Sequence, residues 1–386
     1  MIQEKTFYSL QDISIMPACV TEINHRAECN PYNDNNNKLP IFVAPMSSVI
    51  DLNNAKIFEF NKLNVVIPRT IDLEDRLNVC EEYFIAVGLN EFENTILTLN
   101  LEDRKPIKIC VDVANGHMKK LIDLCKYAKN RFRNKIIIMA GNVANPLVYY
   151  DYAYAGIDYI RLSIGSGSAC TTAANAAIYT PMASLIDECV SIKKIVERDR
   201  NNYKSVPKII ADGGFNNYDD IIKALALGAD YVMCGKIFAQ CEEACGEKLQ
   251  KFLYSDGTYR YLNYYDAIKA KEYMNKANYF SNALSAKIDI NKTSEPYPIT
   301  AFNEIYRNYY GMSTKKAQKE MGKENLHTSE GIEKMVTVEY SLLGWIDNFI
   351  DYLRSAMSYC NATTLDAFKT AKIIKITNSA RNSYFK

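Results

Sequence analysis

Eight short runs of apolar, mostly β-branched residues constrain the fold of this chain more than any other feature. They occupy residues 41–46, 64–68, 83–88, 107–113, 135–141, 159–165, 208–214 and 231–235. The runs are apolar without strict alternation, which is typical of strands buried on both faces of a parallel sheet. Amphipathic helical patterns lie between them, such as residues 117–132 and a segment that ends near Gly228. Alternating strands and helices predict an α/β fold, a (β/α)8 TIM barrel, with a doubly wound open sheet as the alternative.

Composition excludes several classes of protein. The chain has 386 residues, of which 48% are hydrophobic and 24% charged, so it can bury a large core. A net charge of +1 provides no broad basic surface, and we expect no nucleic-acid partner. Apolar runs are too short to span a bilayer, and the first residues lack the apolar stretch of a signal peptide. We therefore expect a cytoplasmic protein with no membrane partner.

The cysteines and histidines show no metal-binding spacing. The 11 cysteines are scattered without a CxxC pair, which favours neither a zinc ribbon nor a disulfide scaffold. His25, His117 and His327 lie far apart in the sequence, so a histidine-based metal site is not expected. Most single cysteines in such a chain act as small buried hydrophobic residues.

The sequence changes character after residue 245. Residues 250–306 are rich in Tyr, Asn, Lys and Ala and contain no clear strand pattern, so we predict an insertion after strand eight that forms a flap or lid. Residues 345–360 have the pattern of an amphipathic closing helix. The whole of residues 1–386 is interpreted as one catalytic barrel domain that carries this insertion.

Loops that follow the last three strands carry the residues best suited to chemistry, because such loops build the active site of a barrel. Gly213 and Gly214 precede a helix that begins near Asn217, which predicts a phosphate cradle beside Gly235. Asp212 is placed to accept hydrogen bonds from a ribose diol. The alternative is that this glycine pair only makes a tight turn.

The loop after strand six, "GSGSACTT", combines flexible residues with a single thiol. Cys170 is expected at the start of a helix, where the positive helix end lowers the pKa of thiols. Thr171 and Thr172 follow it and offer hydroxyl groups to a reacting group. A cysteine beside a phosphate cradle suggests covalent catalysis on a nucleotide-like substrate. The alternative is an ordinary buried cysteine.

Several motifs together resemble one known family. The segments "VDVANGH", "MAGNV", "GSGSACTT", "IIADGGFNNYDDIIKALALGADYVMCGKIFA", "EEACGE", "YYGMS" and "SEGIE" occur in the order found in the IMP dehydrogenase/GMP reductase family. The resemblance extends from "FVAPM" to "LRSAMSYC" and so covers nearly the whole chain. It implies a barrel that binds a purine 5′-monophosphate and a nicotinamide cofactor.

The resemblance also implies roles for individual residues. Cys170 is similar to the nucleophile that attacks purine C2. By the same resemblance, substrate is bound by Ser168, Asp212, Gly213, Gly214, Gly235, Met312, Ser313 and Ser329, and the cofactor by Asp112, Ala114, Asn115, Gly116 and Asn142. Lys236 departs from the family, which has a small residue there, and it is interpreted either as an added charge for the phosphate or as a side chain that points to solvent. The backbone carbonyls of Gly165, Gly167 and Cys170 match the loop that holds a potassium ion. A homotetramer is also implied.

Features of the sequence favour the reductase branch over the dehydrogenase branch. Dehydrogenases activate water with an Arg-Tyr pair between the "GM" and "EG" segments, and here that interval, "STKKAQKEMGKENLHTS", has neither residue. Arg260 and Tyr261 lie upstream of it. The short connection 69–82 leaves no room for the regulatory CBS insertion of most dehydrogenases. The runs "CTT", "YYGMS" and "TSEG" are also similar to the reductases.

A reductase would convert GMP to IMP and ammonia with NADPH, and the resemblance then makes Thr172 and Glu330 the pair that moves protons for the leaving amine. Other features depart from the reductases: Ala173 replaces a basic residue, His327 replaces an arginine, and "EEACGE" is similar to the dehydrogenases. An IMP dehydrogenase that activates water with His327 or an inserted residue, and an inactive nucleotide-binding regulator, are the alternatives.

Overall fold

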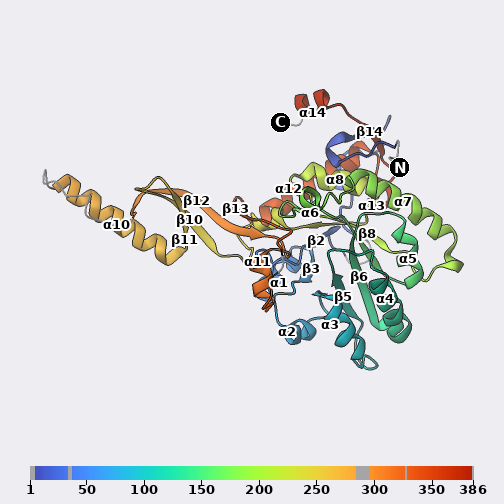
Figure 1. Cartoon of the computed structure of the whole chain (residues 1–386). Coiled ribbons are helices and arrows are strands. Elements are labelled where there is room, and N and C mark those ends of the chain that lie inside the picture. Colours follow the sequence, from blue (N-terminus) through green and yellow to red (C-terminus); the bar gives the residue numbers. More distant parts are fainter. Residues whose placement is uncertain (1–4, 34–36, 284–295, 327, 385–386) are drawn as a thin grey trace.

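A closed barrel of parallel strands forms the body of the protein (Figure 1). The computed structural model describes residues 5–33, 37–283, 296–326 and 328–384. The barrel strands are β2 (Ile41–Val43), β3 (Asn64–Ile67), β4 (Phe84–Val87), β5 (Ile107–Asp112), β6 (Ile136–Val143), β7 (Tyr159–Leu162), β8 (Lys208–Asp212) and β9 (Tyr231–Cys234). Each predicted run contains the core of one strand, and β2 pairs with β9 to close the barrel. The TIM-barrel prediction is therefore confirmed and the open sheet is excluded.

Helices between the strands surround the barrel. They are α1 (Ala55–Phe60), α2 (Leu73–Asn78), α3 (Leu89–Asn94), α4 (Lys119–Phe132), α5 (Val148–Ala155), α6 (Thr172–Ala176), α7 (Met182–Arg198), α8 (Tyr218–Ala226) and α9 (Lys236–Ala239). The predicted stripe on α4 buries Leu121, Cys125 and Ala128, as its spacing indicated. Gly228 follows α8 with φ of 109°, a conformation that ends a helix at little cost only for glycine.

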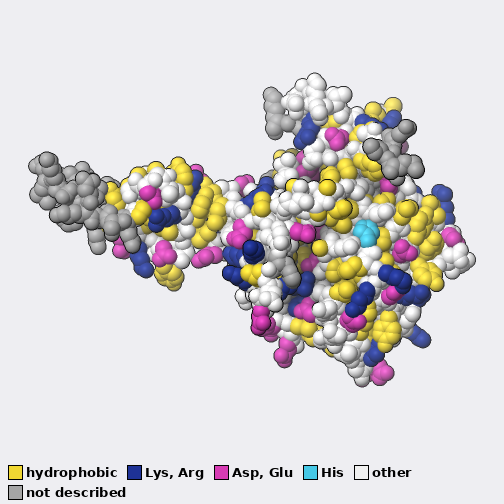
Figure 2. Space-filling view, viewed as in Figure 1, with side chains coloured by type: hydrophobic (Ala, Val, Ile, Leu, Met, Phe, Trp, Pro, Cys, Tyr) yellow, Lys and Arg dark blue, Asp and Glu magenta, His cyan; other side chains and the backbone are white. Residues whose placement is uncertain are grey.

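The segment after β9, the eighth strand of the barrel, forms a structured arm with strands of its own, so the prediction that it contains no strands was wrong. The arm contains β10 (Lys248–Tyr254), β11 (Tyr259–Leu262), α10 (Tyr264–Ala283) and β12 (Pro298–Tyr310), and a fourth strand, β13 (Glu333–Thr337), completes its antiparallel sheet. Phe252 and Tyr254 pack against Ala267 and Ala270 of α10. Figure 1 shows the arm extending well beyond the barrel, and Figure 2 shows hydrophobic side chains on its surface.

The hairpin at the start of the arm has a local sequence signal. Asp256 and Gly257 lie between alternating segments, and Gly257 has φ of 81°. The Asp256 carboxylate accepts the Thr258 N–H at 2.9 Å, as an aspartate commonly does in a turn. An Asp-Gly turn between alternating residues predicts a hairpin. The dense Tyr and Lys content obscured that alternation.

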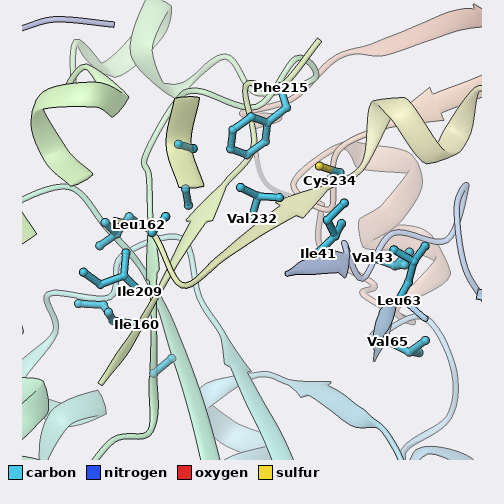
Figure 3. Close-up of a cluster of buried hydrophobic side chains, with 14 of the residues drawn as sticks. Ile41, Val43, Leu63, Val65, Ile160, Leu162, Ile209, Phe215, Val232 and Cys234 are labelled. Atoms are coloured by element: carbon cyan, nitrogen blue, oxygen red, sulfur yellow. The ribbon is translucent and has the colours of Figure 1, made fainter. Parts of the chain in front are cut away.

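Two apolar layers hold the barrel together because successive strand residues point to opposite faces. Ile41, Val43 and Val232 belong to the layer between strands and helices (Figure 3). Phe42, which lies between Ile41 and Val43, belongs to a second cluster that fills the barrel interior. Its ring centroid lies 5.0 Å from that of Tyr231. Burial on both faces explains why the strand segments are apolar without alternation.

The first and last strands that the structure describes pair with each other beside the barrel. Strand β1 (Ile13–Met16) pairs with β14 (Lys372–Lys375) in an antiparallel ribbon. The remaining helices are α11 (Lys315–Glu320), α12 (Leu342–Tyr359), α13 (Leu365–Phe368) and α14 (Asn378–Tyr384). The predicted closing helix is α12. In the described ranges, none of the helices has the length and apolarity needed to cross a membrane.

Candidate active site

The predicted nucleophile lies in the loop between β7 and α6, at the carboxyl end of the barrel. Cys170 is half-buried, whereas most of the other cysteines, including Cys110 and Cys234, are buried. Burial raises the pKa of the Cys110 thiol to about 12, as expected for a cysteine that acts as a core residue. The predicted helix follows Cys170, but α6 has only five residues. Hydrogen bonds from nearby side chains, rather than a long helix, therefore define the surroundings of the Cys170 thiol.

Cys170, Thr172 and Glu330 form one hydrogen-bonded row. The Cys170 Sγ atom lies 3.2 Å from Thr172 Oγ1. Thr172 Oγ1 in turn donates to Glu330 Oε2 at 2.9 Å, across 158 positions in the chain. Because the threonine hydrogen points to the carboxylate, the Cys170 S–H is left to donate to the threonine oxygen. The structure thus brings together the three residues predicted to be catalytic.

Backbone pairing holds this row in place. Cys170 and Gly331 form an isolated antiparallel bridge. The Thr171 N–H donates to the Glu330 carbonyl at 2.8 Å, and the Ile332 N–H donates to the Ala169 carbonyl at 2.9 Å. A methyl group at Gly331 would lie 3.0 Å from the Ala169 carbonyl oxygen. The backbone segments around Ala169 and Gly331 can therefore approach this closely only because residue 331 is a glycine.

The glycine pair after β8 makes a turn that needs glycine. Gly213 and Gly214 have φ of 82° and 84°, which other residues adopt only with strain. The Gly213 N–H donates to the Met233 carbonyl at 3.1 Å, so it is engaged in the barrel and not presented to a ligand. A methyl group at Gly214 would lie 3.1 Å from the Ser166 carbonyl oxygen. The turn therefore packs against the Cys170 loop.

Ser168, Gly235 and Tyr309 meet at one point beside these glycines. A methyl group at Gly235 would lie 2.7 Å from Met46 Sδ and 3.0 Å from the Tyr309 hydroxyl. Tyr309 is buried and hydrogen-bonds the Ser168 side chain, and burial raises its pKa to about 12. Lys236 follows Gly235 and donates to Asn216 Oδ1 at 3.3 Å. Sequence reasoning missed Tyr309, although it is the first residue of the "YYGMS" motif.

A buried arginine links two of the predicted aspartates. Arg161 on β7 donates to Asp112 Oδ1 at 2.6 Å and to Asp212 Oδ2 at 2.8 Å. Asn142 Nδ2 donates to the same Asp212 oxygen at 2.7 Å. Burial alone would lower the pKa of Arg161, but the charges of Asp212 and Asp112 outweigh burial and raise it above its ordinary value. Sequence reasoning found the aspartates and Asn142 but missed the cation that orients them.

The predicted cofactor segment lies beside this arginine at the end of β5. The Gly116 N–H donates to the Asn142 carbonyl at 2.7 Å, and the Tyr152 hydroxyl donates to the Gly116 carbonyl at 3.0 Å. Asn115 Oδ1 accepts the His117 N–H, which shapes the exposed turn after Ala114. Gly116 is therefore packed into the protein, whereas the Asn115 turn faces outward.

The remaining predicted residues lie on the two segments that approach Cys170 from the arm. Gly311, which precedes Met312, approaches the Ala169 carbonyl, and Ser313 Oγ lies 3.0 Å from a methyl placed on Gly331. Ser329 Oγ donates to the Gly331 carbonyl at 2.5 Å. His327, the residue offered as an alternative water activator, lies outside the described residues.

The loop predicted to hold a monovalent cation is tightly turned. Gly165 has φ of 80°, and the Gly167 carbonyl accepts the Cys170 N–H at 2.8 Å. That carbonyl retains one lone pair, and backbone carbonyls are the oxygen donors that suit potassium.

Comparisons with known proteins agree with the motifs. The family model described as "IMP dehydrogenase / GMP reductase domain" matches residues 83–294 and 289–383. The chain is 30% identical over 298 residues to the GMP reductase of Oceanobacillus iheyensis, covering 73% of this chain and 81% of that protein. It is 25% identical over 393 residues to the GMP reductase of Clostridium acetobutylicum, covering 98% of each. An inosine-5′-monophosphate dehydrogenase of Chlorobaculum tepidum is 29% identical over 272 residues, 70% of this chain, which spans only 45% of that protein.

Proposed function

Because the chain belongs to the IMP dehydrogenase/GMP reductase family, we propose that it is a GMP reductase, which converts GMP to IMP and ammonia with NADPH. Members of this family are oxidoreductases that act on purine mononucleotides with a nicotinamide cofactor. The observation that carries the proposal is the row from the Cys170 thiol through Thr172 to the Glu330 carboxylate.

The direction of these hydrogen bonds gives the row a chemical use. A proton can pass from Cys170 to the Thr172 oxygen as the threonine proton passes to Glu330, which leaves a thiolate and a carboxylic acid. The thiolate is the reactive form of cysteine. The same two groups can then return the proton to an amine that leaves from the carbon under attack. One relay therefore activates the nucleophile and improves the leaving group.

The reaction balances with these groups. Cys170 Sγ bonds to purine C2 of GMP, and the C2–N bond breaks as Thr172 and Glu330 protonate the amine, which releases ammonia. NADPH, held by Asp112 and the Asn115 turn, would supply a hydride to C2. The C2–S bond then breaks, IMP is released, and Cys170 recovers a proton. The sum is GMP, NADPH and two protons converted to IMP, NADP⁺ and ammonium.

The chain offers a suitable set of substrate contacts. We assign the phosphate to Ser168, Gly214, Gly235 and Lys236, the ribose to Asp212, base and phosphate contacts to Met312 and Ser313, and a base contact to Ser329. Gly213, whose N–H is bonded to the Met233 carbonyl, shapes the turn that carries Gly214. The fixed orientation of Asp212 by Arg161 and Asn142 supports its role toward a diol. Tyr309 is linked to the residues assigned to the phosphate by its hydrogen bond to the Ser168 side chain.

The chemistry of the proposed cofactor segment fits a nicotinamide nucleotide. Asp112 keeps one carboxylate oxygen outside its bond to Arg161, and the Asn115 turn is exposed. Together with Ala114 and Asn142 they offer donors and acceptors that suit a carboxamide and ribose hydroxyls. Gly116, whose N–H and carbonyl are both bonded within the protein, shapes the segment that presents them. We also propose a potassium ion on the carbonyls of Gly165, Gly167 and Cys170, a homotetramer and a cytoplasmic location.

The alternative activity, IMP dehydrogenase, requires a group that activates water at the purine. Arg260 and Tyr261 lie on β11, the edge strand of the arm sheet opposite β13, which follows Glu330. Arg260 is paired with Asp256 and stacks over Tyr254. The interval after Met312 folds instead as α11, whose Glu320 accepts the Tyr310 hydroxyl at 2.7 Å. These contacts favour the reductase.

A spectrophotometric assay in both directions tests the proposal. With GMP and NADPH, absorbance at the nicotinamide band should fall and ammonia should appear in equal amount. With IMP, NAD⁺ and water, absorbance should not rise. A rise in the second mixture would favour the dehydrogenase, and binding without turnover in either mixture would favour the inactive regulator.

A further inference from the structure

The loop that carries Cys170 has one attachment that the proposed chemistry does not use. Lys334 Nζ donates to the Ser168 carbonyl at 2.6 Å, across 166 positions in the chain. This carbonyl lies two residues before the nucleophile. Within the part of the chain that the structure describes, Lys334 forms no ion pair with a carboxylate. Its ammonium group is therefore committed to a backbone oxygen of the catalytic loop.

The position of Lys334 is fixed by the arm. Strand β13 pairs with β12 along its whole length, and in that register Lys334 lies directly opposite Tyr309. Directly opposed residues of antiparallel strands project from the same face of a sheet. Tyr309 hydrogen-bonds the Ser168 side chain while Lys334 holds the Ser168 carbonyl. A cross-strand pair of the arm therefore contacts both ends of one loop residue.

These contacts continue the backbone pairing around the nucleophile. The partners Thr171–Glu330, Cys170–Gly331 and Ala169–Ile332 follow one antiparallel register, and Ser168–Lys334 adds a side-chain link at its end. Free rotation of the loop at Ser168 would turn Cys170 away from Thr172. A misplacement of about 1 Å at reacting atoms can cost a hundredfold in rate.

We propose that Lys334 is a positioning residue for Cys170: it holds the nucleophile's loop on the arm and so keeps the thiol in line with Thr172 and Glu330. For turnover the inference rests on the proposed reductase activity. The geometry of the free protein tests it independently of that activity.

Three variants separate the possible roles of this side chain. Lys334→Met removes the donor and keeps most of the apolar stem. Lys334→Arg keeps a cationic donor for the same carbonyl. Lys248→Met, which changes an exposed lysine of the same sheet, is the matched control. The measurements are hydrogen exchange of the Thr171 and Ile332 amides, kcat and KM for GMP, and the urea midpoint.

The proposal expects Lys334→Met to exchange both amides faster and to lower kcat about tenfold, with Lys334→Arg regaining most of the loss and Lys248→Met matching wild type. A higher KM with unchanged kcat and exchange would mean that Lys334 binds substrate directly, which overturns the proposal. A lower urea midpoint with unchanged kcat and exchange would also overturn it. If the wild-type protein reduces no GMP, the proposed function fails, and the exchange data alone decide the role of Lys334.

Discussion

Replacement of Arg161 by leucine should destabilise the protein far more than loss of an ordinary ion pair. The side chain of Arg161 is 6% exposed, and those of its partners Asp112 and Asp212 are 15% and 12% exposed. Its guanidinium reaches Asp212 Oδ2 from two nitrogens, at 2.8 and 3.1 Å, and Asp112 Oδ1 at 2.6 Å. Arg161→Leu leaves two mostly buried carboxylates, of which only Asp212 keeps a donor in Asn142. Breaking a buried pair in this way costs about 3–5 kcal/mol of unfolding free energy.

Urea unfolding followed by the fluorescence of Trp345, the single tryptophan of the chain, measures this cost. Arg104→Leu is the control, because Arg104 and Glu81 form a comparable 2.9 Å pair with side chains 37% and 34% exposed. An exposed pair of this kind contributes about 0–1 kcal/mol. Arg161→Lys keeps the positive charge but cannot bridge both aspartates as arginine does. Its cost in unfolding free energy should therefore lie between those of Arg161→Leu and Arg104→Leu. Equal costs for Arg161→Leu and Arg104→Leu would refute the view that this cluster is a desolvated ion network.

Other predictions concern the catalytic row and the base of the barrel. Gly331→Ala should lower turnover about a hundredfold, because its methyl would force apart the paired backbones; kinetics at saturating substrate check this, and an active variant contradicts it. Thr172→Val should slow alkylation of the neighbouring thiol by iodoacetamide at neutral pH, measured by peptide mapping, and an unchanged rate would exclude the relay. Burial alone would raise the pKa of Asp230, but Lys193 and Lys369 hold it below its ordinary value. Its stabilisation is therefore present above about pH 4 and lost as the pH falls, and Lys369→Met should move acid unfolding, followed by circular dichroism, to higher pH.

The barrel could be predicted from the sequence because strands buried on both faces keep continuous apolar segments. Residues such as Ile41 and Phe42 serve different layers but are both apolar, so the local pattern is strong. The arm was harder to predict, because its half-exposed sheet uses tyrosines and lysines, such as Lys251, whose ammonium group lies over the Tyr259 ring. Polarity alone does not distinguish such a sheet from a loop.

The candidate site was predicted in its parts but not in its connections. Cys170, Thr172 and Glu330 were named from motifs, yet their contact depends on the arm returning β13 to the Cys170 loop. Arg161 was missed because a single charged residue in an apolar strand gives no local signal. The order of the strands in the barrel explains how Arg161 reaches both aspartates. Asp112 ends β5 and Asp212 ends β8, and the strands between them are β6 and β7, which carries Arg161.

Mass spectrometry of the protein quenched with acid during turnover tests the central claim most directly. If Cys170 bonds to purine C2 after displacing the amine, the peptide that contains Cys170 should gain the mass of GMP less ammonia, and Thr172→Val should accumulate less of this adduct. Cys170→Ala should bind GMP without forming it. Turnover of GMP by Cys170→Ala, or an adduct on another residue, would contradict the account.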